Sequence, residues 1–424
     1  MLADRGSEME GDAYSMRKTG WAARRRALLV RSVGAGLAGL LPTVVDDAPP
    51  RIVWRGKVGD IGAAVVPSTV VNLADYGGKP GAGRAVLVDA FGKAFAALAG
   101  AGGGTLFVPA GLYDFGAHAH GKDIILCRNL RNIAISAYGA TFTATTTANV
   151  VPNLFYFFNF QNITIAGANF IDTGFSPWVN WKGMYCVGIQ ADRPSRGFNM
   201  VDCYAENVMG LLASNNNAAG RMHLADLSVQ GEVRNSYYGV GANFVREKVR
   251  VKLACRNVRR AFIAYALNDA DVQVDSRNTA NWPGSNGLVA LVSTGASTGN
   301  VERVRVAVDV SGDGIHSGYV HFYHQGTEAD GYMRDIDATV NLTNVSAAQN
   351  LFVFDHESDG VRATTARVWD RISLHAAVTG RFEGSVVANA SVTTSPGTVY
   401  LDANLAGLGR RAALASGFRV RAPG

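Results

Sequence analysis

The sequence predicts an all-β protein: a right-handed parallel β-helix, which is a solenoid, closed at its N-terminal end by a capping helix. Short strands with alternating apolar residues recur along the body of the chain, and no long helical pattern follows Lys122. Repeats at intervals of about 20 to 40 residues are typical of solenoids. A β-sandwich would need hairpin turns, and the hairpin dipeptide Asn-Gly occurs between these strands only at Asn286-Gly287.

Two kinds of strand recur in this body. The first has the template x-x-(Asn/Asp)-Φ-x-Φ, where Φ is apolar, and occurs at 130–136, 160–166, 224–230 and 333–339. The second begins with a small or polar residue before an apolar pair, and strand alternation assigns its faces. The inward column is predicted to contain Ile263, Val289, Val320, Phe352, Val386 and Val399, with Tyr265, Leu291, Phe322, Phe354, Ala388 and Leu401 two residues later.

A distinct N-terminal segment leads into the repeats. A strand at Val70 precedes Asp-Tyr-Gly-Gly, and the stretch from Val86 to Leu98 has helical spacing, with Val88, Phe91, Phe95 and Leu98 on one face. A glycine run and Thr-Leu-Phe-Val-Pro-Ala-Gly-Leu-Tyr follow. This order resembles the N-terminal part of pectate-lyase-superfamily β-helix proteins, although only Asp89 stands near the position of their paired aspartates. The resemblance implies a carbohydrate-active β-helix whose first coil is covered by the helix.

The start of the chain has the layout of an export signal. Paired arginines at Arg24–Arg26 precede two leucines, and an apolar run of small residues extends from Val33 to Leu41. This pattern resembles a twin-arginine signal and predicts a periplasmic or secreted protein; a basic N-terminal anchor is the alternative. The predicted organisation is an export segment at 1–50, an N-terminal strand and capping helix at 51–121, the β-helix at 122–405 and a C-terminal tail at 406–424. No later run reaches the roughly 18 to 20 apolar residues of a stable membrane span.

The composition limits the partners. Charged residues make up 17% of the chain, the formal net charge is +6, and several basic residues fall in the predicted export segment. No Lys/Arg stripe with interleaved aromatic residues follows residue 50, which argues against nucleic acid. A mild basic excess suits an acidic polysaccharide, or it simply aids solubility. The four cysteines, Cys127, Cys186, Cys203 and Cys255, are predicted to be buried core residues, with a Cys186–Cys203 bridge as the alternative.

The outward positions of the second strand type form the candidate site. His321, Tyr323 and Gln325 fall on one coil, and Asp355 and Glu357 fall on the next. Stacked strands lie about 4.8 Å apart, so Tyr323 and Asp355 are predicted to be direct neighbours. The catalytic candidates are His321, Tyr323, Asp355 and Glu357, and the substrate-binding candidates are Gln325, Asn268, Asn243, Asp402 and Trp282, with Asn389 on the same face. An ordinary solvated face is the alternative.

Two reactions could use these residues. β-Elimination of a uronic-acid polymer needs a base, an acid and a partner for the sugar carboxylate, which His321, Tyr323 and Gln325 or a nearby arginine would supply. Inverting hydrolysis needs two separated carboxyl groups, and Asp355 and Glu357 lie about 6.5 to 7 Å apart along a strand. A third hypothesis is a non-catalytic, tailspike-like solenoid that binds glycan and assembles as a homotrimer.

Neither reaction requires a cofactor, and the sequence predicts no dedicated metal site. Calcium could be bound by Asp269 and Asp271, whose carboxylate oxygens suit that ion. A turn containing aspartate explains the same residues without a metal.

Overall fold

The computed structural model describes residues 69–176, 182–214, 222–277, 287–294, 299–312, 318–325, 331–344, 350–356, 368–380, 382, 384–389, 398–402 and 418–421. Glu357 and Trp282 lie outside these residues, as does the predicted export segment. No helix in the described part of the chain is both long and apolar enough to cross a membrane.

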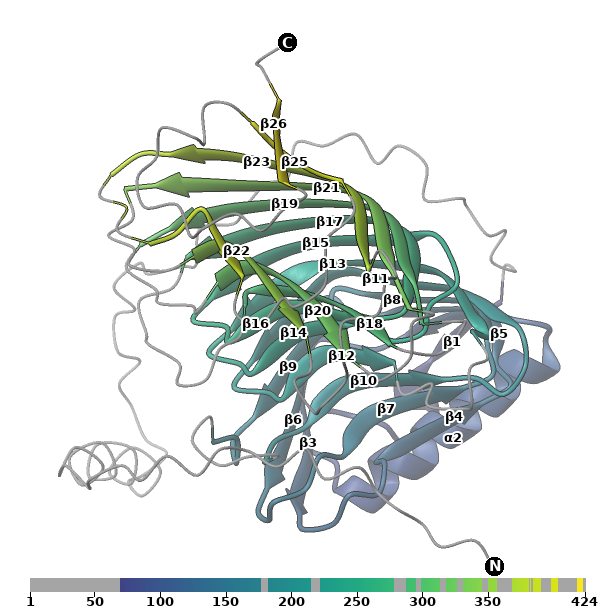
Figure 1. Cartoon of the computed structure of the whole chain (residues 1–424). Helices are drawn as coiled ribbons and strands as arrows, with labels where there is room; N and C mark the ends of the chain where they lie inside the picture. Colours follow the sequence, from purple (N-terminus) through teal and green to yellow (C-terminus); the bar gives the residue numbers. More distant parts are fainter. Residues whose placement is uncertain are drawn as a thin grey trace, which may run out of the picture. The chain divides into compact units, whose positions relative to one another are not determined.

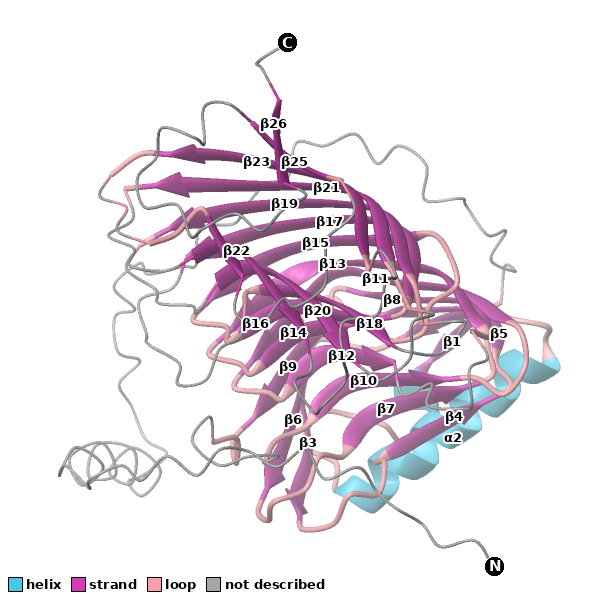
Figure 2. Ribbon diagram, viewed as in Figure 1, coloured by secondary structure: helices cyan, strands magenta, loops and turns pink. Residues whose placement is uncertain are grey.

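The chain is a right-handed parallel β-helix, as predicted, and the strands among the described residues form two sheets (Figures 1 and 2). Sheet A contains β1 (Val70–Asn72), β2 (Gly104–Phe107), β3 (Gly111–His118), β5 (Arg131–Ser136), β6 (Ala140–Thr146), β8 (Gln161–Ala166), β9 (Asn169–Asp172), β11 (Ser195–Glu206), β13 (Leu224–Arg234), β15 (Val249–Arg256), β17 (Leu267–Arg277), β19 (Val301–Ser311), β21 (Met333–Thr343), β23 (Trp369–Val378), β25 (Val399–Asp402) and β26 (Phe418–Arg421). Sheet B contains β4 (Ile125–Arg128), β7 (Asn153–Phe158), β10 (Tyr185–Gln190), β12 (Gly210–Ser214), β14 (Tyr238–Gly241), β16 (Arg260–Tyr265), β18 (Val289–Thr294), β20 (Gly318–Gln325), β22 (Asn350–His356) and β24 (Val387–Asn389).

Each coil passes through sheet A and then sheet B. In the first coils sheet A receives two short strands per coil, such as β5 and β6. From β11 onward one long strand replaces them, because β11 pairs with both β8 and β9. The last strand, β26, pairs with β25, so the stack extends into the segment that the sequence assigned to a tail.

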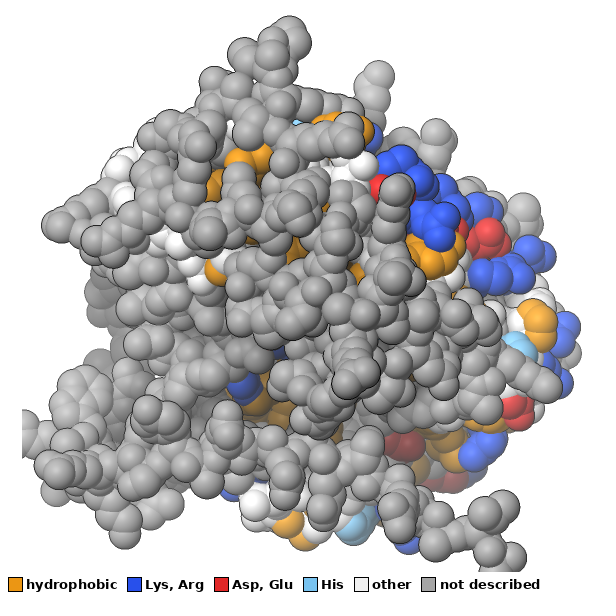
Figure 3. Space-filling view, viewed as in Figure 1, with side chains coloured by type: hydrophobic (Ala, Val, Ile, Leu, Met, Phe, Trp, Pro, Cys, Tyr) orange, Lys and Arg blue, Asp and Glu red, His pale blue; other side chains and the backbone are white. Residues whose placement is uncertain are grey.

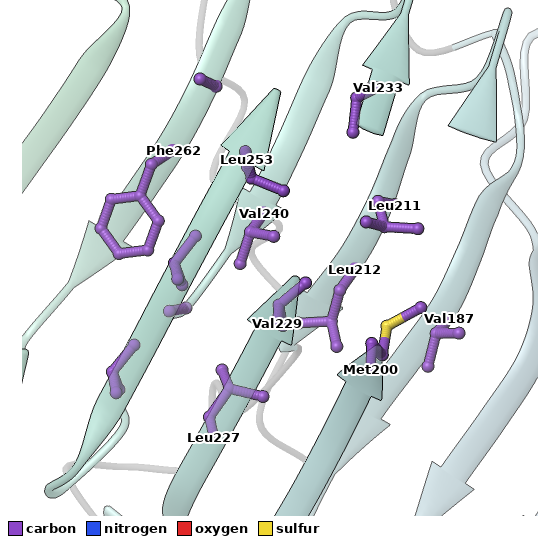
Figure 4. Packing of buried hydrophobic residues seen from close by; sticks show 14 of the residues in the cluster. Val187, Met200, Leu211, Leu212, Leu227, Val229, Val233, Val240, Leu253 and Phe262 are labelled. Atoms are coloured by element: carbon purple, nitrogen blue, oxygen red, sulfur yellow. The ribbon is translucent and has the colours of Figure 1, made fainter. Parts of the chain in front are cut away.

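One apolar side chain per coil forms a continuous inward column in sheet A. The column comprises Ile133, Ile163, Phe198, Leu227, Val249, Ala270, Val304, Ile336, Ile372 and Val399, each at most 4% exposed. Figure 4 shows Val187, Met200, Leu227, Val229 and Phe262 packed in the interior between the sheets. Burial of this stacked apolar surface stabilises the solenoid, since a single coil could not enclose it.

A left-handed corner precedes this column on most coils. The Asn or Asp of the x-x-(Asn/Asp)-Φ-x-Φ template has positive φ in all four predicted copies: Asn132 (53°), Asn162 (52°), Asp226 (56°) and Asp335 (55°). Asn and Asp tolerate this region better than other non-glycine residues. The template therefore marks the corner where the chain enters sheet A.

The corner gives a test of the backbone account. Asn132→Ala is expected to be about 1 to 2 kcal/mol less stable than Asn132→Gly, because alanine is strained at positive φ and glycine is not. Both variants lose the hydrogen bond that Asn162 Nδ2 donates to Asn132 Oδ1 (2.8 Å). The difference between their free energies of unfolding therefore reports the backbone strain alone. Urea denaturation measures it, and equal stabilities would contradict the left-handed corner.

The predicted capping helix is confirmed as α2 (Arg84–Gly100), which follows the 3₁₀ helix η1 (Leu73–Tyr76). Its buried face comprises Leu87, Ala90, Phe91, Ala94, Phe95 and Leu98, whereas Val88 is only partly buried. Phe91 packs edge-on against Phe155 of sheet B at 5.4 Å between ring centroids. The helix therefore covers the apolar interior of the first coils.

All four cysteines are buried and free, so the Cys186–Cys203 bridge is absent. Burial raises the pKa of the Cys203 thiol to about 12. These residues act as small core side chains, as predicted.

The predicted inward column of sheet B is wrong by one residue on two coils. Phe262, rather than Ile263, pairs with Val289 and is fully buried, and Val387, rather than Val386, pairs with Phe352. Consequently Tyr265 and Ala388 pair with outward residues, and Asn389 pairs with the inward Phe354. Both segments contain adjacent apolar residues, so alternation alone does not choose the face. Val399 and Leu401 lie in sheet A instead, paired with Ile372 and Leu374.

Candidate functional site

Three of the predicted catalytic residues meet on sheet B. Tyr323 of β20 pairs with Asp355 of β22, which confirms that they are neighbours on adjacent coils. His321 Nε2 lies 3.6 Å from Asp355 Oδ2, and the His321 and Tyr323 rings are 5.6 Å apart. These three residues form the sheet B cluster.

The His321 side chain is not openly exposed. The residue is 5% exposed, and its Nε2 has no hydrogen-bond partner among the described residues. An extended polymer therefore has little access to this imidazole in the described structure.

The predicted substrate-binding residues do not share one face. Gln325 ends β20, next to Thr294, and Asn243 follows β14, where its Nδ2 donates to the Ser214 carbonyl (3.3 Å). Asn268 lies in β17 and Asp402 in β25, both in sheet A. The prediction that both residues share a face with His321 is wrong, because it stacked only strands of the second type, which form sheet B.

Asp402 takes part in a different cluster, on sheet A. Its Oδ2 lies 2.6 Å from Nδ1 of His375, and His375 Nε2 lies 3.5 Å from Asp337 Oδ1. A carboxylate only accepts hydrogen bonds, so Asp402 fixes the His375 tautomer with the proton on Nδ1. The His375 side chain is 34% exposed and reaches solvent. Asp337, His375 and Asp402 are named the carboxylate–histidine cluster.

A charged groove adjoins this cluster. It has a volume of about 320 Å³ and is lined by Arg250, Asp269, Ala270, Asp271, Arg303, Val304, Arg305, Asp335 and Asp337. Asp337 belongs to both the groove and the carboxylate–histidine cluster. Charged side chains gather along the right-hand edge of the molecule in Figure 3. We call the groove that is lined by these nine residues the sheet A groove.

Several charges of the groove are held by ion pairs. Arg371 donates two hydrogen bonds to Asp335 (2.6 and 2.8 Å), which lower the pKa of that carboxyl group. Arg250 lies 3.3 Å from Asp269. Arg305 is exposed and, within the described residues, makes no hydrogen bond or ion pair. Its guanidinium is therefore available to an external anion.

A pair of carboxylates lies further along the same strands. Asp275 and Asp309 are directly paired across β17 and β19. Partial burial and the charge of Asp309 raise the pKa of Asp275. A carboxyl group with a raised pKa next to a second carboxyl group is the residue pair that glycoside hydrolysis uses as acid and base.

The structure also locates the residues considered for calcium. Asp269 has positive φ (51°) near the start of β17, and its carboxylate lies 3.3 Å from the Arg250 guanidinium. Within the described part of the chain, no three His, Cys, Asp or Glu residues are grouped so as to hold a metal ion. Asp269 has the left-handed backbone of a turn residue, which is the alternative that the sequence offered for this residue.

The sequence did contain a signal for the sheet A groove. Like charges occur two residues apart at Lys248 and Arg250, Asp269 and Asp271, Arg303 and Arg305, and Asp335 and Asp337. In a strand this spacing places both side chains on one face. Alignment of these pairs predicts a charged surface across neighbouring coils of sheet A.

No family model matches the chain, and no curated protein sequence matches it. Solved structures with a similar chain path include the surface protein and adhesin PfbA of Streptococcus pneumoniae (11% identity, 84% of this chain and 96% of that chain, TM-score 0.41). Others are the A-module of a mannuronan C-5 epimerase of Azotobacter vinelandii (12%, 76% and 100%, 0.35) and an endo-xylogalacturonan hydrolase of Aspergillus tubingensis (11%, 84% and 100%, 0.33). At these identities and TM-scores, the matches do not define the activity of this chain.

Proposed function

We propose that this protein binds an acidic polysaccharide along the sheet A groove and cleaves it by β-elimination at the carboxylate–histidine cluster. The observation that carries the proposal is the unpaired Arg305 guanidinium in a groove that shares Asp337 with His375. The predicted export signal agrees with a substrate outside the cytoplasm.

Arg305 is proposed to bind the sugar carboxylate. A guanidinium matches a carboxylate with two parallel hydrogen bonds and stays charged at every relevant pH. Neutralising the carboxylate makes the neighbouring C–H proton easier to remove, which is the first requirement of elimination.

His375 is proposed as the base. With the proton on Nδ1 held by Asp402, the lone pair of Nε2 is available, and Nε2 lies beyond hydrogen-bond distance from Asp337 (3.5 Å). Tyr400 is proposed to protonate the leaving oxygen, because it precedes Asp402 by two residues on the same face of β25 and pairs with Ser373, two residues before His375. The sheet B cluster has the same residue types, but its histidine is buried.

The test is a turnover assay on a panel of uronic-acid polysaccharides. Elimination creates unsaturated ends, which absorb ultraviolet light, and Arg305→Gln should weaken substrate binding. Arg277→Gln, an exposed arginine of β17 outside the groove, is the matched control and should have no effect. New reducing ends without ultraviolet absorbance would instead indicate hydrolysis, with Asp275 and Asp309 as the carboxyl pair. Binding to no uronan would refute the proposal.

A further inference from the structure

Two parallel rows of charge flank the sheet A groove. The corner ladder consists of the positive-φ residues Asp226, Lys248, Asp269, Arg303, Asp335 and Arg371. The charged column consists of Arg250, Asp271, Arg305 and Asp337, which are paired in register from β15 to β21. The two rows run across the strands, along the direction in which the coils stack.

Each of the four coils from β15 to β21 carries the same sign in both rows, and the sign alternates from coil to coil. Lys248 and Arg250 form a positive band, and Asp269 and Asp271 form a negative band on the next coil. A second positive band follows at Arg303 and Arg305, and then a second negative band at Asp335 and Asp337. Since stacked strands are about 4.8 Å apart, bands of one sign repeat at about 9.6 Å.

Ion pairing between neighbouring coils explains part of this alternation. Lys248 lies 3.5 Å from Asp226, and Arg371 pairs with Asp335. Opposite charges on adjacent strands stabilise a sheet modestly. Such pairing accounts for alternation within one row.

Ion pairs between neighbouring coils do not account for the second positive band. Arg303 pairs with Glu302 on its own strand (2.5 Å) and Arg305 has no partner in the described residues. Both are exposed and line the groove. This band therefore presents two guanidinium groups between two negative bands.

We infer that the polysaccharide bound in the groove carries a uronate on every second sugar, with an uncharged sugar between. The inference rests on the proposed function and narrows its substrate class. An extended glycan advances by roughly one strand spacing per sugar, so alternate uronates would meet the two positive bands. A uronate on every sugar would also place carboxylates over Asp271 and Asp337, where like charges repel.

The experiment compares two probes of equal length at low salt. One is an oligosaccharide of hyaluronan, in which glucuronate alternates with an N-acetylated sugar, and the other is an oligogalacturonate, with a carboxylate on every sugar. Calorimetry should show at least about tenfold tighter binding of the alternating probe. Neutral dextran provides the baseline.

A double variant tests whether the negative bands cause the preference. Asp271→Ser with Asp337→Ser should reduce the preference to about threefold or less, by improving oligogalacturonate binding. Asp89→Ser is the matched control, because Asp89 is an exposed aspartate of α2 outside the groove, and it should keep the full preference.

The outcomes separate this inference from the proposed function. Equal or tighter binding of oligogalacturonate, or a preference that survives the double variant, would overturn the inference and leave acidic-polysaccharide binding intact. Binding of neither probe above the dextran baseline would overturn both.

Discussion

Replacing His375 with glutamine is expected to lower the rate of polysaccharide cleavage by about 10² to 10⁴-fold. Removing a general base typically has an effect of this size, and glutamine keeps a hydrogen-bonding side chain without the basic nitrogen. The thermal stability should change little, because the His375 side chain is partly exposed and does not belong to the buried hydrophobic core. The measurement is the rate at which unsaturated ends appear at saturating substrate.

The matched control is His321→Gln in the sheet B cluster. It should leave turnover within a few-fold of the parent protein if cleavage occurs on sheet A. Loss of turnover in His321→Gln together with full activity in His375→Gln would move the catalytic site to His321, Tyr323 and Asp355.

Phe322→Ala is expected to reduce the free energy of unfolding by about 3 to 5 kcal/mol. Phe322 is fully buried, pairs with Leu291 and Phe354 on the neighbouring coils, and stacks on the Phe354 ring at 4.7 Å between centroids. Truncation to alanine leaves a cavity between coils that cannot collapse without moving the strands. Chemical denaturation with a two-state check measures the change.

The same substitution on an exposed ring provides the control for Phe322. Phe107 of β2 is 43% exposed, so Phe107→Ala should cost much less than Phe322→Ala. A silent Phe322→Ala would mean that this residue faces outward, and the faces of β20 would then have to be exchanged.

Much of the fold follows from local physical rules. Asn132, Asn162, Asp226 and Asp335 were recognisable as a repeated template because few non-glycine residues adopt positive φ readily. The capping helix was recognisable because Phe91, Phe95 and Leu98 recur at helical spacing. In both cases one local requirement restricts the residue types, so the sequence reveals it.

The register and the site depend on longer-range information. At Ala261, Phe262 and Ile263 either apolar face satisfies alternation, and only the neighbouring coil decides that Phe262 faces inward. Corner positions occupied by Lys248, Arg303 and Arg371 do not resemble turn residues, so the corner ladder was not apparent. The cluster of Asp337, His375 and Asp402 joins three separate coils, which no short motif describes.

The most direct test of the central hypothesis is a crystal structure of the His375→Gln variant with a uronic-acid oligosaccharide. The sugar should lie along the sheet A groove, with one carboxylate within about 3 Å of the Arg305 guanidinium nitrogens. An oligosaccharide bound over His321, Tyr323 and Asp355, with Arg305 making no contact, would contradict the assignment of this groove as the substrate site.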